Sequence, residues 1–301
     1  MHQMYEILKN NLEGEVLWQE PMKNQTTFHI GGPVDILIIP NSIKDLRQAL
    51  GILKSMEAPI MIMGAGSNLL VSDKGIRGVV IKIGPGFDEI KTVKKLLICG
   101  AGVTLTAISR QAQKAGLTGL EFAVGIPGSV GRALVMNAGA YGGEISQVLK
   151  TATVLDRDGD KKTYANQDLH FGYRHSRFLE EDLIVLEATF ELQSGNKEEI
   201  LKKMQELTEQ RRSKQPIEHF CAGSVFKRPP NNYVGPLIEK AGLKGFRIGG
   251  AEVSKKHAGF IVNVDNATCE DVLSLIKLIQ KTIKEKEGIV LEPEIRVVGE
   301  I

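Results

Sequence analysis

Short apolar runs alternate with amphipathic stretches over the first third of the chain. Residues 34–39 form an apolar, β-branched run between a Gly-Pro pair and a proline, which is typical of a buried strand. Residues 42–56 place apolar side chains at helical spacing, and Ser42 is the expected N-cap. Two further short strands are expected at 60–63 and 78–83. The pattern therefore predicts alternating strands and helices in this part of the chain.

A second mixed stretch begins near Lys91. Residues 96–99 predict a strand, and residues 105–115 predict a helix that ends at a glycine. Two longer strands are expected at 150–155 and 183–192, on either side of the segment FGYRHSRF. This stretch is therefore also expected to mix helices and strands.

Ser194-Gly195-Asn196 is the best candidate for a domain boundary, because three turn-forming residues follow one another there. Beyond it, helices are expected at 197–212, 236–241 and 269–287, and strands near 251–253, 260–264 and in LEPEIRVVG. We therefore expect an α+β protein in three parts, at residues 1–90, 91–195 and 196–301.

Charge and hydropathy narrow the classes of partner. The 38 Lys and Arg residues nearly balance the 36 Asp and Glu residues, for a formal net charge of +2. Such a balance argues against a nucleic-acid partner, which needs a strongly basic surface. No apolar run approaches the roughly 20 residues that span a bilayer, and the N-terminus lacks a signal-peptide core. We expect small-molecule partners, with no nucleic acid, no membrane and no obligate protein partner.

The cysteines indicate a reducing compartment. Cys99, Cys221 and Cys269 lie far apart, and none belongs to a CxxC pair. An odd and sparse set of this kind predicts reduced thiols rather than disulfides or a zinc site. We therefore expect a cytoplasmic protein without a bound metal.

The first glycine-rich loop, GAGSNLL at residues 64–70, directly follows a predicted strand. It lacks the third glycine of a dinucleotide-binding fingerprint, where Leu69 stands, and the lysine of a P-loop. Its backbone N–H groups, with Ser67 and Asn68, suit a pyrophosphate. An ordinary tight turn explains the same residues equally well.

The second glycine-rich region is longer. GIPGSVG at 125–131 and MNAGAYG at 136–142 are joined by a short apolar segment. Two loops that allow close backbone approach indicate a surface shaped around an extended ligand, and small residues suit a large planar ring such as an isoalloxazine. The alternative is a pair of tight turns.

Seven motifs follow one another along the chain: GAGSNLLV, GIPGSVG, MNAGAYGGE, GYRHS, AGSVFK, GLKGFRIGGAEVSKKHAGFIVN and LEPE. Together they resemble the UDP-N-acetylenolpyruvoylglucosamine reductase family of peptidoglycan precursor synthesis, from residue 24 to residue 299. The chain lacks the extra tyrosine-bearing loop of the longer members, so it resembles the shorter second type.

The resemblance implies an FAD-binding domain of the vanillyl-alcohol-oxidase (PCMH) type, with α+β subdomains at 1–90 and 91–195, and a C-terminal α+β substrate-binding domain at 196–301. It implies non-covalent FAD, NADPH as co-substrate and UDP-N-acetylenolpyruvoylglucosamine as substrate. The implied cofactor-binding residues lie in the glycine-rich loops: Gly64, Ala65, Gly66, Ser67, Asn68, Leu69, Gly125, Pro127, Gly128, Ser129, Val130, Asn137, Gly139 and Ala140.

Three residues match the catalytic positions of the family. The resemblance implies that Ser224 donates a proton, while Arg174 and Glu294 polarise the substrate carboxylate. Hydride addition to the terminal vinyl carbon spreads negative charge onto that carboxylate, and a cation with a protonated acid stabilises such charge in a dry site. Each residue also has a plain structural reading: a surface ion pair for Arg174, a turn for Ser224 and a solvated strand end for Glu294.

The resemblance further implies that Tyr173, Arg212, Lys227 and His257 line the substrate diphosphate or carboxylate. A structural role explains His257 as well, and Arg212 also suits a solvated helical face. In the family an asparagine that touches phosphate stands where this chain has Arg228, which therefore either strengthens phosphate binding or blocks it.

A second departure is Arg132, which stands where the family has a glycine after GSVG. A guanidinium beside the flavin-binding loop either points outward or alters the loop.

Two other functions are compatible with the same fold. A flavoprotein alcohol oxidase would reoxidise its flavin rapidly with oxygen, but the motif loops offer no evident His or Cys for covalent flavin attachment. A non-enzymatic flavin- or nucleotide-sugar-binding protein would keep the glycine loops, yet it would not need Arg174, Ser224 and Glu294 together.

Overall fold

The computed structural model describes residues 1–300, and the chain folds into two compact units. The first unit comprises Met1–Leu17, Ile36–Ala65 and Val79–Arg211, and the second comprises Trp18–Asp35, Gly66–Gly78 and Arg212–Ile301. Each unit therefore combines separate stretches of the chain. The three consecutive domains expected from the sequence stay a prediction.

A four-stranded sheet forms the N-terminal part of the fold, in the order β1-β2-β5-β3. Its members are β1 (Glu15–Pro21), β2 (Pro33–Ile39), β5 (Ile76–Lys82) and β3 (Ile60–Met63), and β3 pairs with β5 in parallel. The helices α1 (His2–Asn11) and α2 (Ile43–Ser55) accompany it. The hydroxyl of Ser42 accepts the Asp45 N–H at 3.1 Å and so caps α2 as predicted. The predicted helix and strands are confirmed here to within two residues.

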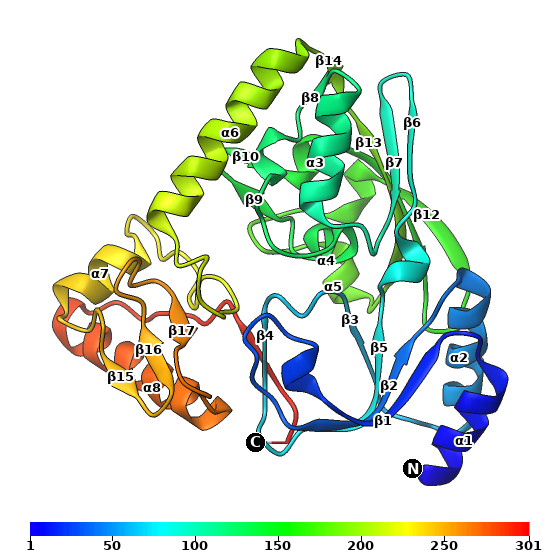
Figure 1. Cartoon of the computed structure of the whole chain (residues 1–301), viewed down its shortest axis with the longest axis horizontal. Helices are drawn as coiled ribbons and strands as arrows, with labels where there is room; N and C mark the ends of the chain where they lie inside the picture. Colours follow the sequence, from blue (N-terminus) through cyan, green and yellow to red (C-terminus); the bar gives the residue numbers. More distant parts are fainter. Residues whose placement is uncertain (301) are drawn as a thin grey trace. The chain divides into compact units, whose positions relative to one another are not determined.

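A five-stranded antiparallel sheet belongs entirely to the first unit (Figure 1). Its order is β12 (Lys161–Ala165), β11 (Leu149–Leu155), β13 (Ile184–Glu191), β7 (Leu96–Gly100) and β6 (Ile90–Val93). The helix α4 (Val130–Val135) packs against β13 and β7, and α3 (Leu105–Lys114) also contacts β7. The predicted strands and helix of this region are confirmed.

The long helix α6 (Lys197–Lys214) is attached to the first unit by few apolar side chains. Ile200, Met204 and Leu207 project from one face of α6 and form a small separate cluster with Val124. Their spacing of four and three residues is that of a single helical face. The rest of the helix surface is strongly charged.

The second unit contains a three-stranded antiparallel sheet covered by α8 (Cys269–Glu287), as Figure 1 shows. The strands are β15 (Arg247–Ile248), β16 (Ala251–Val253) and β17 (Ile261–Asn263), and α7 (Val234–Lys240) packs on α8. Thr268 and Asp271 form a capping box at the start of α8, and Gly288 ends it in the left-handed conformation. In the same unit β18 (Arg296–Val298) pairs in parallel with β4 (Leu69–Val71). The mixed content confirms the predicted α+β class.

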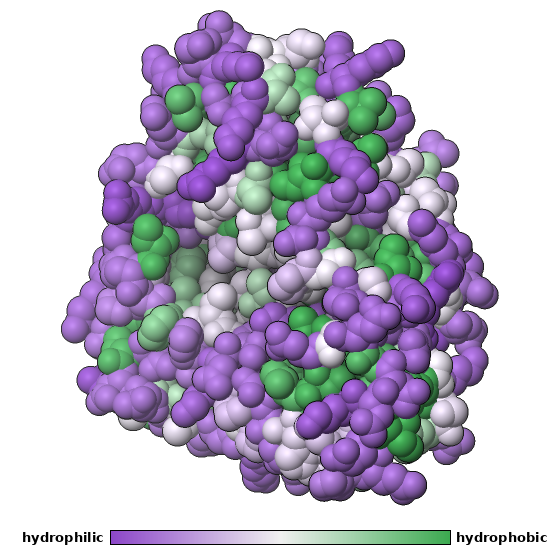
Figure 2. Space-filling view, turned by 45° about the vertical axis from the view of Figure 1, so that its right-hand side comes forward, coloured by the Kyte–Doolittle hydropathy of each residue, from purple (hydrophilic) through white to green (hydrophobic). Residues whose placement is uncertain are grey.

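Within residues 1–300, no helix combines the length and apolar character needed to cross a bilayer. The face drawn in Figure 2 shows hydrophobic residues in scattered groups among hydrophilic ones.

The three cysteines are free thiols. Burial raises the pKa of Cys99 and of Cys221, and burial together with Asp73 and Glu270 raises the pKa of Cys269 to about 12. Thiols with raised pKa values carry little thiolate at neutral pH and are poorly reactive.

Candidate active site

The first residues of α4 are hydrogen-bonded to the segment 101–105 in the first unit. The Val130 N–H donates to Val103 O at 2.8 Å, and the Gly131 N–H donates to Ala101 O at 2.9 Å. A Cβ on Gly131 would lie 2.9 Å from the Ala101 Cβ, so a side chain at this position would push the two segments apart. Gly131 therefore allows α4 to pack closely on the segment of Ala101, next to the loop predicted to bind the cofactor.

Ser129 holds a buried hydroxyl inside this loop. Ser129 is 3% exposed and stands at the N-cap position of α4, but its side chain makes no capping bond. Its Oγ has no hydrogen-bond partner among the described residues. A Cβ on Gly64 would lie 2.5 Å from this Oγ, and 3.7 Å from the Cβ of Arg132. A buried hydroxyl without a partner costs roughly 1–3 kcal/mol unless a ligand satisfies it. The first unit therefore offers an unsatisfied polar group at a place where two glycine-rich loops meet, which fits the binding of a polar part of FAD.

Asn137, in the second glycine-rich region, uses both ends of its side-chain amide within the first unit. Its Nδ2 donates to Gly172 O at 3.2 Å, and its Oδ1 accepts the Ser146 N–H at 3.0 Å. The residue is 3% exposed and has a φ of 43°. Asparagine tolerates this left-handed conformation better than most residues.

Arg174 lies at the tip of a tight turn between Gly172 and His175. The Gly172 N–H donates to His175 O at 3.1 Å, and the His175 N–H donates to Gly172 O at 3.2 Å. Arg174 itself has a φ of 55°, and its guanidinium carbon lies 5.3 Å from the centroid of the exposed Tyr173 ring. A non-glycine residue in this conformation is uncommon, and such strain is frequent at functional sites.

The end of the same turn is held by side chains. Ser176 is fully buried, and its hydroxyl donates to Val135 O at 2.7 Å. The Nε2 of His175 lies 2.8 Å from Glu180 Oε1 at the end of α5 (Arg177–Glu180), and His170 Nδ1 lies 3.6 Å from the other carboxylate oxygen. The hydrogen bond with His175 holds the pKa of Glu180 below its usual range, against the opposing effect of burial.

In the second unit, the segments of Ser224 and Glu294 run side by side. The Glu294 N–H donates to Val225 O at 2.8 Å, and the Lys227 N–H donates to Glu292 O at 2.8 Å. The hydroxyl of Ser224 donates to Phe226 O at 3.2 Å. Two motifs about seventy residues apart in the sequence are thus adjacent, which sequence spacing alone did not indicate.

Asn68 ties the first glycine-rich loop to the Glu294 segment within the second unit. Its Nδ2 donates to Glu294 O at 3.1 Å, and its backbone oxygen accepts the Arg296 N–H at 3.0 Å. These bonds begin the parallel pairing of β4 and β18.

The predicted substrate residues of the second unit have partners of their own. Lys227 Nζ lies 2.5 Å from Glu292 Oε1, and the Arg228 guanidinium carbon lies 4.0 Å from the centroid of the Tyr233 ring. His257 Nδ1 accepts the Gly259 N–H at 3.0 Å, which places the proton of a neutral ring on Nε2. Burial, assisted by Lys244, lowers the pKa of His257.

Arg212, which the sequence predicted for the site, is exposed. Its neighbour Arg211, which was not predicted for the site, is partly buried. The Arg211 Nε is buried without a hydrogen-bond partner among the described residues, and burial lowers the pKa of this guanidinium. Its Cδ would lie 3.3 Å from a Cβ on Gly125, and its guanidinium carbon lies 6.0 Å from the Tyr141 ring centroid. Arg211 follows Leu207 by four residues on the apolar face of α6, and this spacing is the signal that the sequence offered.

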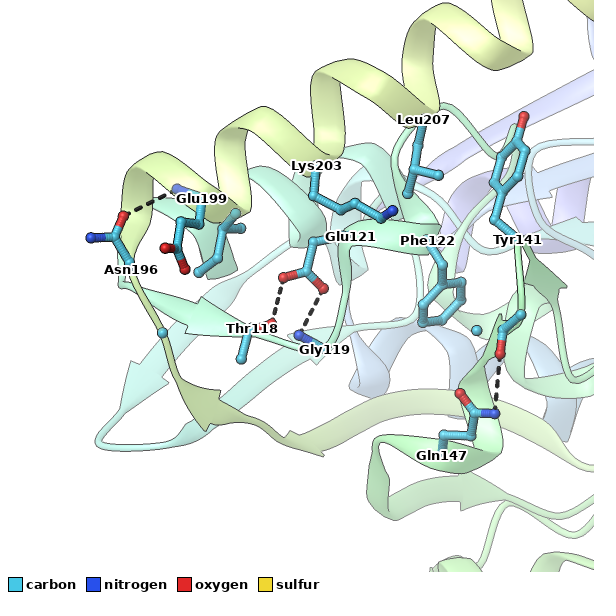
Figure 3. A pocket seen from close by; sticks show the side chains of 14 residues that line it. Thr118, Gly119, Glu121, Phe122, Tyr141, Gln147, Asn196, Glu199, Lys203 and Leu207 are labelled. Atoms are coloured by element: carbon cyan, nitrogen blue, oxygen red, sulfur yellow. Dashed lines mark hydrogen bonds between the residues drawn. The ribbon is translucent and has the colours of Figure 1, made fainter.

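A cavity of about 490 Å³ lies between α6 and the loops of the first unit (Figure 3). In Figure 3, Lys203 and Leu207 descend from α6 toward Phe122 and Tyr141. Beside Lys203 in this view, the Glu121 carboxylate accepts the Thr118 hydroxyl at 2.6 Å and the Gly119 N–H at 2.8 Å. None of the residues predicted for the site line this cavity, although Tyr141 follows directly after Ala140.

Two family models match the chain. An FAD binding domain matches residues 34–163, and the C-terminal domain of UDP-N-acetylenolpyruvoylglucosamine reductase matches residues 215–298.

Curated proteins and a solved structure are similar over nearly the full length. The UDP-N-acetylenolpyruvoylglucosamine reductase of Caldanaerobacter subterraneus subsp. tengcongensis is 51% identical over 98% of this chain and 96% of its own. The UDP-N-acetylenolpyruvoylglucosamine reductase 2 of Bacillus cereus is 46% identical over 100% of this chain and 98% of its own. The crystal structure of UDP-N-acetylenolpyruvylglucosamine reductase from Thermus caldophilus matches with a TM-score of 0.81 at 36% identity, covering 95% of this chain and 99% of that one.

Proposed function

This chain is a member of the UDP-N-acetylenolpyruvoylglucosamine reductase family, and we propose how its residues divide the work of an FAD-dependent, NADPH-linked reduction. The reaction converts the enolpyruvyl ether of UDP-N-acetylglucosamine into the lactyl ether of UDP-N-acetylmuramate, in peptidoglycan precursor synthesis. NADPH supplies a hydride, water supplies a proton, and the carbon–carbon double bond becomes a single bond. The observation that carries the assignment of residues is the pairing of the Ser224 and Glu294 segments through the Glu294 N–H and Val225 O, 2.8 Å apart.

Bound FAD would supply the hydride transfer from NADPH to the terminal vinyl carbon. The hydroxyl of Ser129 and the close approach of Gly64 fit a polar group of this cofactor. The other glycine-loop residues keep their predicted cofactor-binding roles in this proposal, except that the side chains of Asn68 and Asn137 bond the protein itself.

Arg174 and Glu294 act on the substrate carboxylate in this proposal. Charge that develops on the carboxylate during hydride addition is stabilised by the Arg174 guanidinium and by a hydrogen bond from a protonated Glu294. Fixed donors are effective because they need no reorganisation during the reaction. The tight turn at Arg174 and the two-sided backbone pairing of Glu294 support such fixed positions.

Ser224 delivers the proton to the carbon next to the carboxylate. An unactivated hydroxyl is a weak acid in water, but it serves when a strongly basic enolate-like carbon is held against it. The backbone of Ser224 is bridged to Phe260, which fixes the segment from the other side.

Tyr173, Arg212, Lys227, Arg228 and His257 stay proposals for binding the diphosphate or carboxylate of the substrate. We propose Arg211 as a further cation for this purpose. Its buried, partly desolvated guanidinium makes stronger charge-assisted hydrogen bonds than an exposed one.

We also propose a cytoplasmic location and a contribution to cell-wall growth, cell shape and division, because the product enters peptidoglycan synthesis. The near-neutral net charge of +2 supports small-molecule partners.

A visible absorption titration tests the function. We expect the purified protein to carry a flavin that NADPH bleaches and that UDP-N-acetylglucosamine enolpyruvate restores without oxygen. Colourless protein, or a flavin that NADPH does not reduce, would contradict the proposal. Rapid restoration by oxygen alone would instead indicate an oxidase.

A further inference from the structure

The first glycine-rich loop and the second glycine-rich region each carry one asparagine, and its side chain bonds a segment that holds a catalytic candidate. In the first unit, Asn137 Nδ2 donates to Gly172 O at 3.2 Å, two residues before Arg174. In the second unit, Asn68 Nδ2 donates to Glu294 O at 3.1 Å. In both units, therefore, an asparagine amide donates to a backbone oxygen at or near a catalytic candidate.

The side chain of Asn137 is committed to the protein itself. Its amide spans two segments, because Oδ1 accepts the Ser146 N–H at 3.0 Å while Nδ2 reaches Gly172. An aspartate would lack the donor, and a glutamine would be one methylene longer. The left-handed φ of 43° at this buried position also favours asparagine over other amide or apolar residues.

The turn of Arg174 needs outside support. Two backbone bonds between Gly172 and His175 close the turn, and the φ of 55° at Arg174 stores backbone strain. A strained backbone conformation persists only when contacts with the surrounding structure hold it in place. Asn137 supplies such a constraint from the flavin loop.

Asn68 constrains Glu294 in a comparable way. The carbonyl of Glu294 accepts the Asn68 amide, while its N–H donates to Val225 O at 2.8 Å. Asn68 also accepts the Arg296 N–H through its own carbonyl at 3.0 Å. Both peptide groups of Glu294 are thus fixed, and one of the two bonds comes from the first glycine-rich loop.

We propose that Asn68 and Asn137 are positioning residues, which tie Glu294 and the Arg174 turn to the loops that hold FAD, rather than side-chain ligands of FAD. This inference rests on the proposed roles of Arg174 and Glu294. It implies that cofactor binding and the placement of the catalytic groups are coupled, because the same loop segments serve both.

The test separates cofactor affinity from the second half-reaction. The aspartate variants Asn68→Asp and Asn137→Asp remove the amide donor and keep the shape of the side chain, but they add a charge. The neutral variants Asn68→Ala and Asn137→Gly remove the whole amide group. In the neutral variants we expect FAD affinity and flavin reduction by NADPH to stay within about three-fold, since no cofactor contact is lost. Reoxidation of the reduced flavin by the enolpyruvyl substrate should fall on the order of 10²-fold, the typical cost of a misplacement of about 1 Å.

Two other asparagines provide matched controls. Asn166 Nδ2 donates to Ser146 O and Leu149 O at 2.7 and 2.6 Å, and Asn263 bonds Phe28 O and the Ala267 N–H at 3.1 and 2.9 Å. Asn166→Ala and Asn263→Ala should lower the unfolding temperature and leave the flavin reoxidation rate unchanged.

A readout independent of turnover is amide hydrogen exchange of residues 172–175. FAD should increase their protection in the wild-type protein and fail to do so in Asn137→Gly. A parallel loss of FAD affinity and reoxidation in the neutral variants, or an unchanged reoxidation rate, would overturn the inference. If Arg174→Lys and Glu294→Gln leave reoxidation intact, the proposed function of those residues fails instead.

Discussion

Gly64 and Ser129 face each other so closely that a Cβ on Gly64 would lie 2.5 Å from the Ser129 hydroxyl oxygen. The two residues therefore form one tightly packed wall of the predicted cofactor site within the first unit. The Ser129 hydroxyl in this wall has no hydrogen-bond partner among the described residues. Adding one methyl group at Gly64 forces this hydroxyl to move.

We accordingly expect Gly64→Ala to weaken FAD binding, because the displaced Ser129 hydroxyl would lose a hydrogen bond to the cofactor worth about 0.5–1.5 kcal/mol. The ratio of flavin to protein absorbance and a fluorescence titration with FAD measure the effect. Gly51→Ala is the matched control, because nothing lies within 4 Å of a Cβ at that helical position. Full flavin content in Gly64→Ala would rule out this wall as part of the cofactor site.

Ser224→Ala should separate the two half-reactions. Flavin reduction by NADPH should stay nearly intact, while reoxidation by the enolpyruvyl substrate should slow by roughly 10²–10⁴-fold, the usual contribution of a general acid. Stopped-flow absorbance under anaerobic conditions resolves the two steps. Ser274→Ala, at a half-buried position of α8, serves as the control. Equal losses in both steps would refute the role of proton donor.

The His175–Glu180 pair should influence the Arg174 turn through the bond of 2.8 Å between them. We expect His175→Ala and Glu180→Ala to slow substrate-dependent reoxidation by a few-fold, with flavin reduction unaffected. His175→Gln should restore part of the rate, because an amide still donates to the carboxylate. Glu181→Ala removes a neighbouring carboxylate that bonds Arg177 instead, and it should have no effect. Equal rates in the Glu180 and Glu181 variants would exclude the pair from positioning.

The ion pair of Lys227 and Glu292 should compete with the substrate for the lysine. Glu292→Gln is expected to lower KM for the nucleotide sugar by at most about five-fold, since exposed ion pairs are worth only about 0–1 kcal/mol. Steady-state kinetics at low and high salt measure the change, which should shrink as salt increases. Glu287→Gln, which breaks the comparable pair with Lys240, is the control. A raised KM in Glu292→Gln would show that the carboxylate, not the lysine, is needed.

His257 should make folding stability depend on pH. Its pKa is lowered by burial, so the folded protein resists protonation while the unfolded chain accepts a proton near the ordinary pKa of about 6.5. Stability is therefore fully present above that value and decreases as the pH falls below it. Urea unfolding at pH 7.5 and 5.5 should show a smaller difference for His257→Gln than for the wild type. His2→Gln, at an exposed position, should leave the difference unchanged.

Local sequence signals predicted the secondary structure well. The helix Cys269–Glu287 was expected at its observed bounds, and in the structure Thr268 with Asp271 caps its start while Gly288 ends it. The strand Pro33–Ile39 was equally clear from its bounding glycine and prolines. The assignment to the reductase family rested on the ordered motifs, which the comparisons confirm.

The site was harder to predict, because its arrangement depends on pairings between distant segments. Arg211 and Arg212 are adjacent and chemically identical, and only the phase of α6 distinguishes the buried guanidinium from the exposed one. The bonds of Asn68 to Glu294 and of Asn137 to Gly172 join residues 226 and 35 positions apart. A single sequence carries no local signal for such contacts.

The attachment of α6 has a consequence for local unfolding. Among residues 1–300, the buried apolar contacts of this helix come from Ile200, Met204 and Leu207, which pack on Val124, so releasing the helix exposes little hydrophobic surface. Segments of this kind open at a lower free energy than the global transition. The amides of α6 should therefore exchange with solvent well before those of the five-stranded sheet, and Arg211 would be exposed in each opening.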